Sequence, residues 1–247
     1  ASALTGLYIF SNFQATLNNF EYDAKRVISG FARDQNQIEE RVEEEKHLDE
    51  APSALAKLMP NDLDLDAVKD SNKYSTRGMF LRAYRWDKVF RGIGKEEGVP
   101  DDILAALAMR ESYGNPLELN SGADGGAGLM MFQPGTARAF GLRIYGNSRA
   151  SGRDRNHGVK LRELVRRHGW NYERLRVADE RFDVYQSTRA AAKYLKKEFN
   201  RHGSWDEALS AYNRGTPARN PRATDHVRAI RSYRQYYREH RDDRRKS

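Results

Sequence analysis

Glu111 is the acidic residue of this sequence whose setting best suits chemistry. It stands near the end of the segment DDILAALAMRES, where residues at three- and four-residue steps are Leu104, Leu107, Ala108 and Glu111. This spacing predicts a helix from about Asp102 to Ser112, with Glu111 on the stripe that faces the interior. Loss of water would raise the pKa of the carboxyl group, as a general acid working near neutral pH requires. The alternative is a helix-end glutamate that turns to solvent or pairs with an arginine.

Two further segments carry groups that could meet this carboxyl group. The stretch SGADGGAGLMMFQPGTARAFGL follows the predicted helix, and its glycines at 125, 126 and 128 allow the backbone to approach a ligand closely. Tyr212 and Asn213 come much later, at the end of another predicted helix. Their phenol and amide can hydrogen-bond a carboxyl group or a sugar.

Together, the three segments resemble the signature of the lytic transglycosylase and goose-type lysozyme family. The resemblance rests on Glu111-Ser112, on Gly128-Leu129-Met130-Met131 with Pro134-Gly135-Thr136-Ala137, and on Ala211-Tyr212-Asn213. The segment STRAAAKYLKKEF is similar to the preceding helix of the membrane-bound lytic transglycosylase D-like branch. One motif alone would be a weak indication, but three in the right order, between about Phe80 and Gly215, are specific.

The resemblance implies a lysozyme-like catalytic domain that cleaves peptidoglycan between N-acetylmuramic acid and N-acetylglucosamine. Glu111 would protonate the glycosidic oxygen and then act as base towards the sugar's own C6 hydroxyl, which gives a 1,6-anhydro product. Tyr212 would orient Glu111 or the substrate, and Ser112 would support the sugar ring or its lactyl arm. The other expected substrate-binding residues are Met130, Met131, Gln133 and Asn213.

This chemistry needs one protein carboxylate, whereas ordinary glycosidases use two. The candidates for a second carboxylate are Glu118, Asp124 and Asp183, and we expect each of them to be a surface charge. We expect no cofactor, and no metal because the histidines are scattered without an H-x-x-x-H spacing.

Met131 departs from the family pattern, which carries Gln at this position of the loop. A glutamine, Gln133, stands two residues later. A thioether in place of an amide removes one hydrogen-bond donor and one acceptor near the bound sugar. Our hypothesis is a shifted substrate preference, towards glycan whose N-acetyl group is modified or missing. De-N-acetylated peptidoglycan would favour a water-using, lysozyme-like hydrolysis. A non-catalytic glycan-binding protein is the other alternative.

The predicted fold class is all-α, or α+β at most, with a small irregular or β element near 120–132. Residues 1–76 are expected to form an N-terminal helical extension and linker, and 77–247 the lysozyme-like domain with a basic C-terminal helix. Asp101 is expected to cap the helix of Glu111, and Ser187 or Thr188 to open a later helix that Gly203 stops. An arginine-rich insertion at 143–176 either lines the groove or is solvated.

Two further helix features are expected after Gly203. Ser204 and Glu207 form a capping box for the helix that ends in the Tyr-Asn motif. The last helix carries an apolar stripe at steps of three and four, made of Val227, Ile230, Tyr233 and Tyr237.

Composition narrows the partners and the location. The chain has 247 residues, 43 basic against 35 acidic side chains and a net charge of +8, which suits a polyanion. Nucleic acid is the alternative polyanion because the tail RSYRQYYREHRDDRRKS interleaves Tyr and Arg, but its tyrosines fit a core stripe better, so we expect no nucleic acid partner. No cysteine is present, which excludes disulfides and thiol catalysis. We expect a monomer without a membrane span, exported to the periplasm or secreted.

Overall fold

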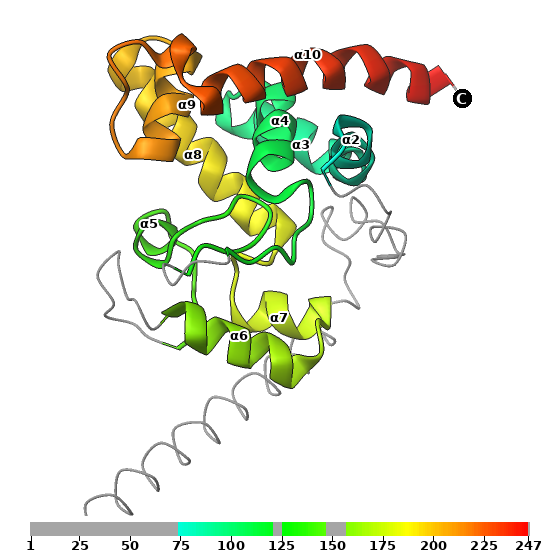
Figure 1. Cartoon of the computed structure of the whole chain (residues 1–247), viewed down its shortest axis with the longest axis vertical. Helices are drawn as coiled ribbons and strands as arrows, with labels where there is room; N and C mark the ends of the chain where they lie inside the picture. The colour runs from blue at the N-terminus through cyan, green and yellow to red at the C-terminus, as the bar shows by residue number, and fades with distance from the viewer. Residues whose placement is uncertain (1–73, 121–124, 147–156, 247) are drawn as a thin grey trace, which may run out of the picture. The chain divides into compact units, whose positions relative to one another are not determined.

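The computed structural model describes residues 74–120, 125–146 and 157–246. In these ranges the regular structure is helical, which confirms the all-α prediction (Figure 1). The helices are α2 (Thr76–Tyr84), α3 (Asp87–Glu97), α4 (Asp101–Ser112), α5 (Pro134–Ala139), α6 (His157–His168), α7 (Tyr172–Ala178), α8 (Val184–His202), α9 (Trp205–Arg214) and α10 (Asp225–Lys246), with a short 3-10 turn at Pro221–Ala223. The β element expected near 120–132 is reduced to two isolated bridges, which join Ala127 to Leu119 and to Phe132. The N-terminal extension expected at 1–76 lies almost entirely outside the described residues.

The helix of Glu111, α4, is the centre of the core. Its residues 103–109 are fully buried, so the helix is covered on all sides along most of its length. The surrounding helices are α2, α3, α8 and α10 (Figure 1). A helix that is apolar all round is buried all round, and this burial fixes the position of the last turn of α4.

Asp101 does not cap α4, contrary to the sequence prediction. The residue before the helix is Pro100, and no side chain accepts a hydrogen bond from the first turn. The Asp101 carboxylate pairs instead with Arg241 of α10 at 2.7 Å. Asp102 beside it is buried and pairs with Arg234 at 2.7 Å and with Arg238. These ion pairs join α10 to the first turn of α4, so tertiary contacts determine the use of both carboxylates.

The apolar stripe of α10 packs as its spacing predicted. Val227, Ile230 and Tyr237 are fully buried, and Tyr233 is partly exposed. The Tyr237 hydroxyl donates a hydrogen bond to Asp87 at 3.0 Å. The tail tyrosines expected to belong to a core stripe are therefore largely part of the core.

Helix α8 begins four to five residues earlier than predicted. Asp183 caps it by accepting a hydrogen bond from the Gln186 amide at 2.8 Å, so Ser187 and Thr188 are buried inside the helix. Serine, threonine and aspartate are all good N-caps, and the sequence offered several in succession. The predicted stop at Gly203 is confirmed by its left-handed conformation, with φ of 86°.

The predicted cap of α9 by Ser204 is confirmed, whereas the Glu207 carboxylate bonds to the Ser204 hydroxyl in place of the backbone N–H that a capping box uses. The Ser204 hydroxyl accepts a hydrogen bond from the Glu207 amide at 3.2 Å and donates one to the Glu207 carboxylate at 2.7 Å. Because α8 and α9 pack closely against each other, this tight turn places the end of α9 beside the middle of α8.

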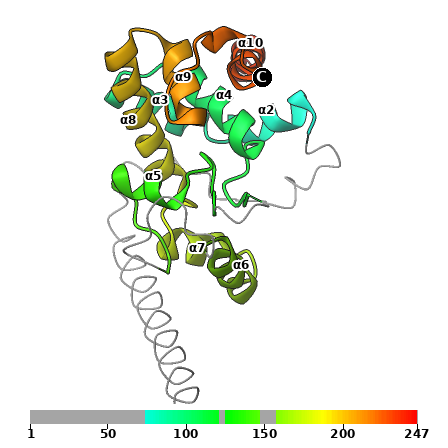
Figure 2. The same cartoon turned by 60° about the vertical axis from the view of Figure 1, so that its left-hand side comes forward.

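The described part of the arginine-rich insertion includes the adjacent helices α6 and α7 (Figure 2). Residues 147–156 of the insertion lie outside the described residues. Trp170, in the turn between the two helices, is 51% exposed. Among the helices of the described ranges, none has a stretch apolar enough over a sufficient length to cross a membrane.

Candidate active site

Glu111 lies in the last turn of α4, and its side chain is only 16% exposed. Burial raises the pKa of its carboxyl group to about 7, and the positive charge of Arg110 only partly opposes this shift. The helix ends directly afterwards at Tyr113, which adopts a left-handed conformation with φ of 58°. The C-terminal end of α4 therefore carries a carboxyl group that can keep its proton at neutral pH. The apolar stripe of this helix in the sequence had predicted such a buried carboxyl group.

The glycine-rich loop approaches the segment between α7 and α8 closely. A Cβ atom at Gly128, where φ is 81°, would lie 1.7 Å from the carbonyl oxygen of Arg181, so only glycine fits there. The fully buried Arg181 donates hydrogen bonds to the carbonyl oxygens of Gly125 at 2.6 Å and Phe132 at 3.2 Å. One arginine thus fastens both ends of the loop's turn.

Asp179 and His157 complete the buried network around Arg181. Two hydrogen bonds of 2.9 and 2.7 Å join the Arg181 guanidinium to the Asp179 carboxylate, and a third of 2.6 Å reaches Nε2 of His157. Burial alone would raise the pKa of Asp179, but the guanidinium holds this pKa below its usual range. The network attaches the loop to the segment between α7 and α8.

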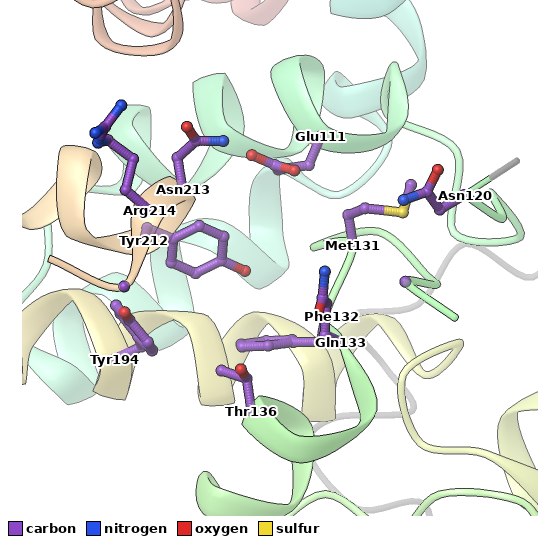
Figure 3. Close-up of a pocket in the computed structure, with 12 residues that line it drawn as sticks. Glu111, Asn120, Met131, Phe132, Gln133, Thr136, Tyr194, Tyr212, Asn213 and Arg214 are labelled. Atoms are coloured by element: carbon purple, nitrogen blue, oxygen red, sulfur yellow. The ribbon is translucent and has the colours of Figure 1, made fainter. Parts of the chain in front are cut away.

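The end of α4, the loop and the α8–α9 hairpin enclose a pocket of about 530 Å³ (Figure 3). Its walls combine one carboxyl group, amides, aromatic rings, a thioether and one guanidinium. The lining residues are Glu111, Asn120, Gly126, Met131, Phe132, Gln133, Thr136, Tyr194, Tyr212, Asn213, Arg214 and Gly215. Such a mixed, concave surface is suited to a polar ligand with apolar ring faces, such as a sugar.

Most of the site residues predicted from the sequence meet in this pocket. Glu111, Met131, Gln133, Tyr212 and Asn213 all line it. In Figure 3 the amide of Asn213 and the carboxyl group of Glu111 point toward one another, and the thioether of Met131 points toward Asn120. The loop motif and the Tyr-Asn motif therefore face Glu111, although they are far apart in the sequence.

Ser112 and Met130 are placed differently. Both are fully buried, and neither is among the residues that line the pocket. The Ser112 hydroxyl donates a hydrogen bond to the carbonyl oxygen of Ala108 at 3.1 Å, within α4. Met130 contributes its backbone carbonyl, which accepts a hydrogen bond from the Tyr212 hydroxyl at 2.7 Å. In this structure the two residues support the site from behind its walls.

The candidates for a second carboxylate do not join Glu111. Asp183 caps α8, and Glu118 accepts a hydrogen bond from Asn115 at 3.3 Å. Asp124 lies outside the described residues. Within the described ranges, Glu111 is the one carboxylate that lines the pocket.

Tyr212 fixes the end of α9 to the loop. Its ring contacts Phe132 at 5.7 Å and Tyr194 at 5.1 Å between centroids, and its hydroxyl donates to Met130. Burial, with the negative charge of Glu111 as a second cause, raises the pKa of the phenol well above its usual range. The hydroxyl therefore keeps its proton and still offers lone pairs that can accept a hydrogen bond.

His226 is a neighbour of Glu111 that sequence reasoning missed. It lies in the first turn of α10 with a side chain that is 6% exposed, and its Nδ1 is 3.6 Å from Oε1 of Glu111. Burial, reinforced by the positive charge of Arg110, lowers the pKa of His226 to about 4. The imidazole is therefore neutral where Glu111 titrates.

The family model of the transglycosylase SLT domain matches residues 88–161 and 162–232. The chain belongs to this transglycosylase SLT domain family. Members of the family are peptidoglycan lytic transglycosylases, so the prediction of a glycoside-cleaving enzyme that acts on peptidoglycan is confirmed at family level. A search among curated proteins found no match.

The residues of the SLT domain that line the pocket are more numerous than those predicted. The additional ones are Asn120, Gly126, Phe132, Thr136, Tyr194, Arg214 and Gly215. The sequence contained a partial indication of Tyr194, because this residue belongs to the helix whose sequence resembles the D-like branch. It also indicated that His226 is buried, because His226 stands four residues before Ile230 on the buried face of α10. What the sequence lacked was any sign that α10 begins beside the end of α4.

Proposed function

We propose that this SLT-family enzyme cleaves glycan strands of peptidoglycan between N-acetylmuramic acid and N-acetylglucosamine, with Glu111 as its single catalytic carboxylate. The observation that carries the proposal is a buried carboxyl group with a pKa of about 7 that lines the pocket without a carboxylate partner among the described lining residues. The enzyme acts outside the cytoplasmic membrane, where peptidoglycan lies. The proposed working form is a monomer.

The proposed reaction uses Glu111 twice. The protonated carboxyl group donates its proton to the glycosidic oxygen as the bond between this oxygen and C1 of the muramic residue breaks. The resulting carboxylate then takes the proton of the C6 hydroxyl of the same residue, whose oxygen bonds to C1 and closes the 1,6-anhydro ring. Glu111 is again protonated at the end, and no water enters. These two reaction steps need no second carboxylate, in agreement with the residues that line the pocket.

The remaining lining residues suit the substrate. The amides of Asn120, Gln133 and Asn213 can hydrogen-bond sugar hydroxyl and N-acetyl groups. Arg214 lines the pocket from the end of α9, and within the described residues no carboxylate forms an ion pair with it. A guanidinium is suited to the lactyl or stem-peptide carboxylate that distinguishes muramic acid from its neighbouring sugar.

Met131 favours a second candidate, a lysozyme-like hydrolase with a preference for de-N-acetylated peptidoglycan. Its side chain lies in the pocket wall beside Asn120 and Gly126, where the family pattern has an amide. Gln133 lines the same pocket, so an amide is still present, but at another point of the wall. A substrate without the N-acetyl group makes no demand on the lost hydrogen bonds and offers no assistance from that group, so water can compete with the C6 hydroxyl as the nucleophile.

Mass spectrometry of soluble products tests both candidates. Purified sacculi and a chemically de-N-acetylated batch are incubated with the wild type, with Glu111→Gln and with the matched control Glu118→Gln, whose carboxylate lies outside the pocket. Anhydro-muropeptides from the wild type and the control, but not from Glu111→Gln, support the transglycosylase. Reducing-end products from the de-N-acetylated batch support the hydrolase. Full activity of Glu111→Gln would contradict both.

A further inference from the structure

The contact between His226 and Glu111 joins two elements that the other site residues do not connect. His226 belongs to the first turn of α10, and Glu111 to the last turn of α4. The 3.6 Å between Nδ1 and Oε1 is slightly too long for a hydrogen bond, which forms only when the two atoms approach each other further. The charged and titratable groups that face the pair are Arg110 of α4 and Tyr212 of α9.

The other ring nitrogen of His226 reports which tautomer is present. Nε2 is buried and has no hydrogen-bond partner among the described residues. A neutral imidazole carries one proton, and among buried backbone groups a donor without an acceptor is rarer than an acceptor without a donor. The proton therefore belongs on Nδ1, where the Glu111 carboxyl group can accept it.

We infer that His226 is a positioning residue that determines which oxygen of Glu111 carries the catalytic proton, and this inference rests on the proposed role of Glu111. With Nδ1–H directed at Oε1, that oxygen is an acceptor, so the proton of the carboxyl group resides on Oε2. Oε2 is then the oxygen left to donate to the glycosidic bond. After the proton has been transferred, the same N–H stabilises the carboxylate that must act as base.

The neutral state of the imidazole matters for this role. A protonated His226 would hold Glu111 in its charged form and remove the general acid. The buried position prevents this because the pKa of His226 falls to about 4, well below the pKa of Glu111. The neutral imidazole of His226 therefore determines which oxygen of Glu111 carries the proton, without making Glu111 lose that proton.

The test compares His226→Asn, His226→Gln and His226→Leu on soluble peptidoglycan fragments, with kcat, KM and the pH profile of kcat/KM as readouts. An asparagine amide occupies the place of Nδ1, a glutamine amide that of Nε2, and leucine offers no donor. His240→Asn is the control, because it removes another histidine from the same helix. Thermal unfolding of each variant establishes that it is folded.

General acid–base catalysis as a whole contributes about 10²- to 10⁴-fold, so loss of proton placement is expected to lower kcat roughly tenfold, with little change in KM. His226→Leu should also move the alkaline limb of the profile to higher pH, because the carboxylate loses its donor. His226→Asn should restore both readouts, and His226→Gln should not. If the leucine variant does not fold, the comparison of asparagine with glutamine decides.

Equal behaviour of the asparagine and glutamine variants, or a leucine variant with an unchanged kcat and pH profile, would overturn the inference. Glu111→Gln is measured in the same assay to separate the two claims. If Glu111→Gln is inactive while the His226 variants resemble the wild type, only the inference about His226 fails. If Glu111→Gln is active, the proposed function itself fails.

Discussion

At the scale of single residues, Glu111 is placed where its charged form is unfavourable for the fold. The pKa of the carboxyl group is about 7 in the folded protein and 4.5 in a model peptide, so the folded state binds the proton more tightly. The contribution of Glu111 to the free energy of unfolding therefore falls as the pH rises from about 4.5 to about 7. Because one pKa unit corresponds to about 1.4 kcal/mol, the loss amounts to about 3 kcal/mol across this range.

Glu111→Gln should consequently stabilise the protein at pH 8 by up to about 3 kcal/mol relative to the wild type, and hardly at all at pH 4.5. Denaturant unfolding of both proteins at the two pH values measures the difference. An advantage of the variant that is as large at pH 4.5 as at pH 8 would contradict the raised pKa. The same substitution is expected to abolish glycan cleavage, so stability and activity change in opposite directions.

Met131 offers a direct test of substrate preference. Its backbone has φ of 50°, which costs any side chain similar strain, and glutamine is unbranched like methionine. Met131→Gln is therefore expected to fold normally and to raise the rate on acetylated relative to de-N-acetylated sacculi several-fold. Product quantification from the two batches gives this ratio. An unchanged ratio would show that the thioether does not determine the preference.

At the scale of elements, the sequence predicted helices better than their junctions. The stripe of α10, the stop at Gly203 and the cap at Ser204 follow local rules, and the structure confirms them. Asp101 was expected to cap a helix and forms an ion pair, whereas Asp183 was expected to be a surface charge and caps α8. Which use prevails depends on Arg241 in one case and on the packing of α8 in the other, and neither is visible in a local window of sequence.

The loop that carries Met131 and Gln133 depends on a close approach that sequence reasoning detected only in outline. Its glycines indicated a nearby ligand, whereas at Gly128 the neighbour is the protein's own backbone at Arg181. Arg181 itself carried no signal, because buried arginines are rare and nothing near it in the sequence indicated burial. The sequence thus predicted which loop residues line the site, but not that Arg181 holds the loop in place.

Gly128→Ala and Gly141→Ala form a matched pair that isolates this close approach. Both glycines have left-handed backbones, with φ of 81° and 86°, so alanine costs each a similar strain of about 1–2 kcal/mol. A Cβ at Gly141 meets nothing within 4 Å, whereas one at Gly128 overlaps the carbonyl of Arg181. Gly128→Ala should therefore lose roughly 2 kcal/mol or more beyond Gly141→Ala in thermal or denaturant unfolding. Equal losses of stability in the two variants would mean that the loop can move away from the Arg181 carbonyl without a cost in free energy.

At the scale of the whole molecule, the described residues that line the pocket all lie between positions 111 and 215. The site draws on α4, the loop, α5, α8 and α9, and α10 brings His226 to its edge. The sequence motifs predicted the five segments from α4 to α9, because each of them matches a part of the family signature. They could not predict α10, whose contribution depends on the path of the chain after Gly215.

A fragment that begins at Tyr74 tests the expected domain boundary. The buried residues of α2, including Met79 and Phe80, belong to the same core as α4 and α10. We expect this fragment to unfold cooperatively and to release the same muropeptides as the full chain. Calorimetry and product analysis provide the measurements. A fragment that begins at Asp87 lacks α2 and serves as the destabilised comparison. A fragment from Tyr74 that is no more stable than the one from Asp87 would place the boundary earlier in the chain.

The buried contact of Glu111 with His226 also has a consequence for proton exchange with the solvent. Between pH 4.5 and 6.5 the unfolded chain has a charged glutamate and a charged histidine, and the folded chain has both groups neutral. Folding thus moves one proton from the imidazole to the carboxyl group and takes up none, so the pair adds no pH dependence to stability there. Calorimetric unfolding at pH 5.5 in buffers of different ionisation heat should reveal this exchange. Relative to the wild type, Glu111→Gln should bind about one more proton on unfolding and His226→Asn about one fewer. Each group alone would make the free energy of unfolding depend on pH, but in opposite directions, so the two contributions cancel.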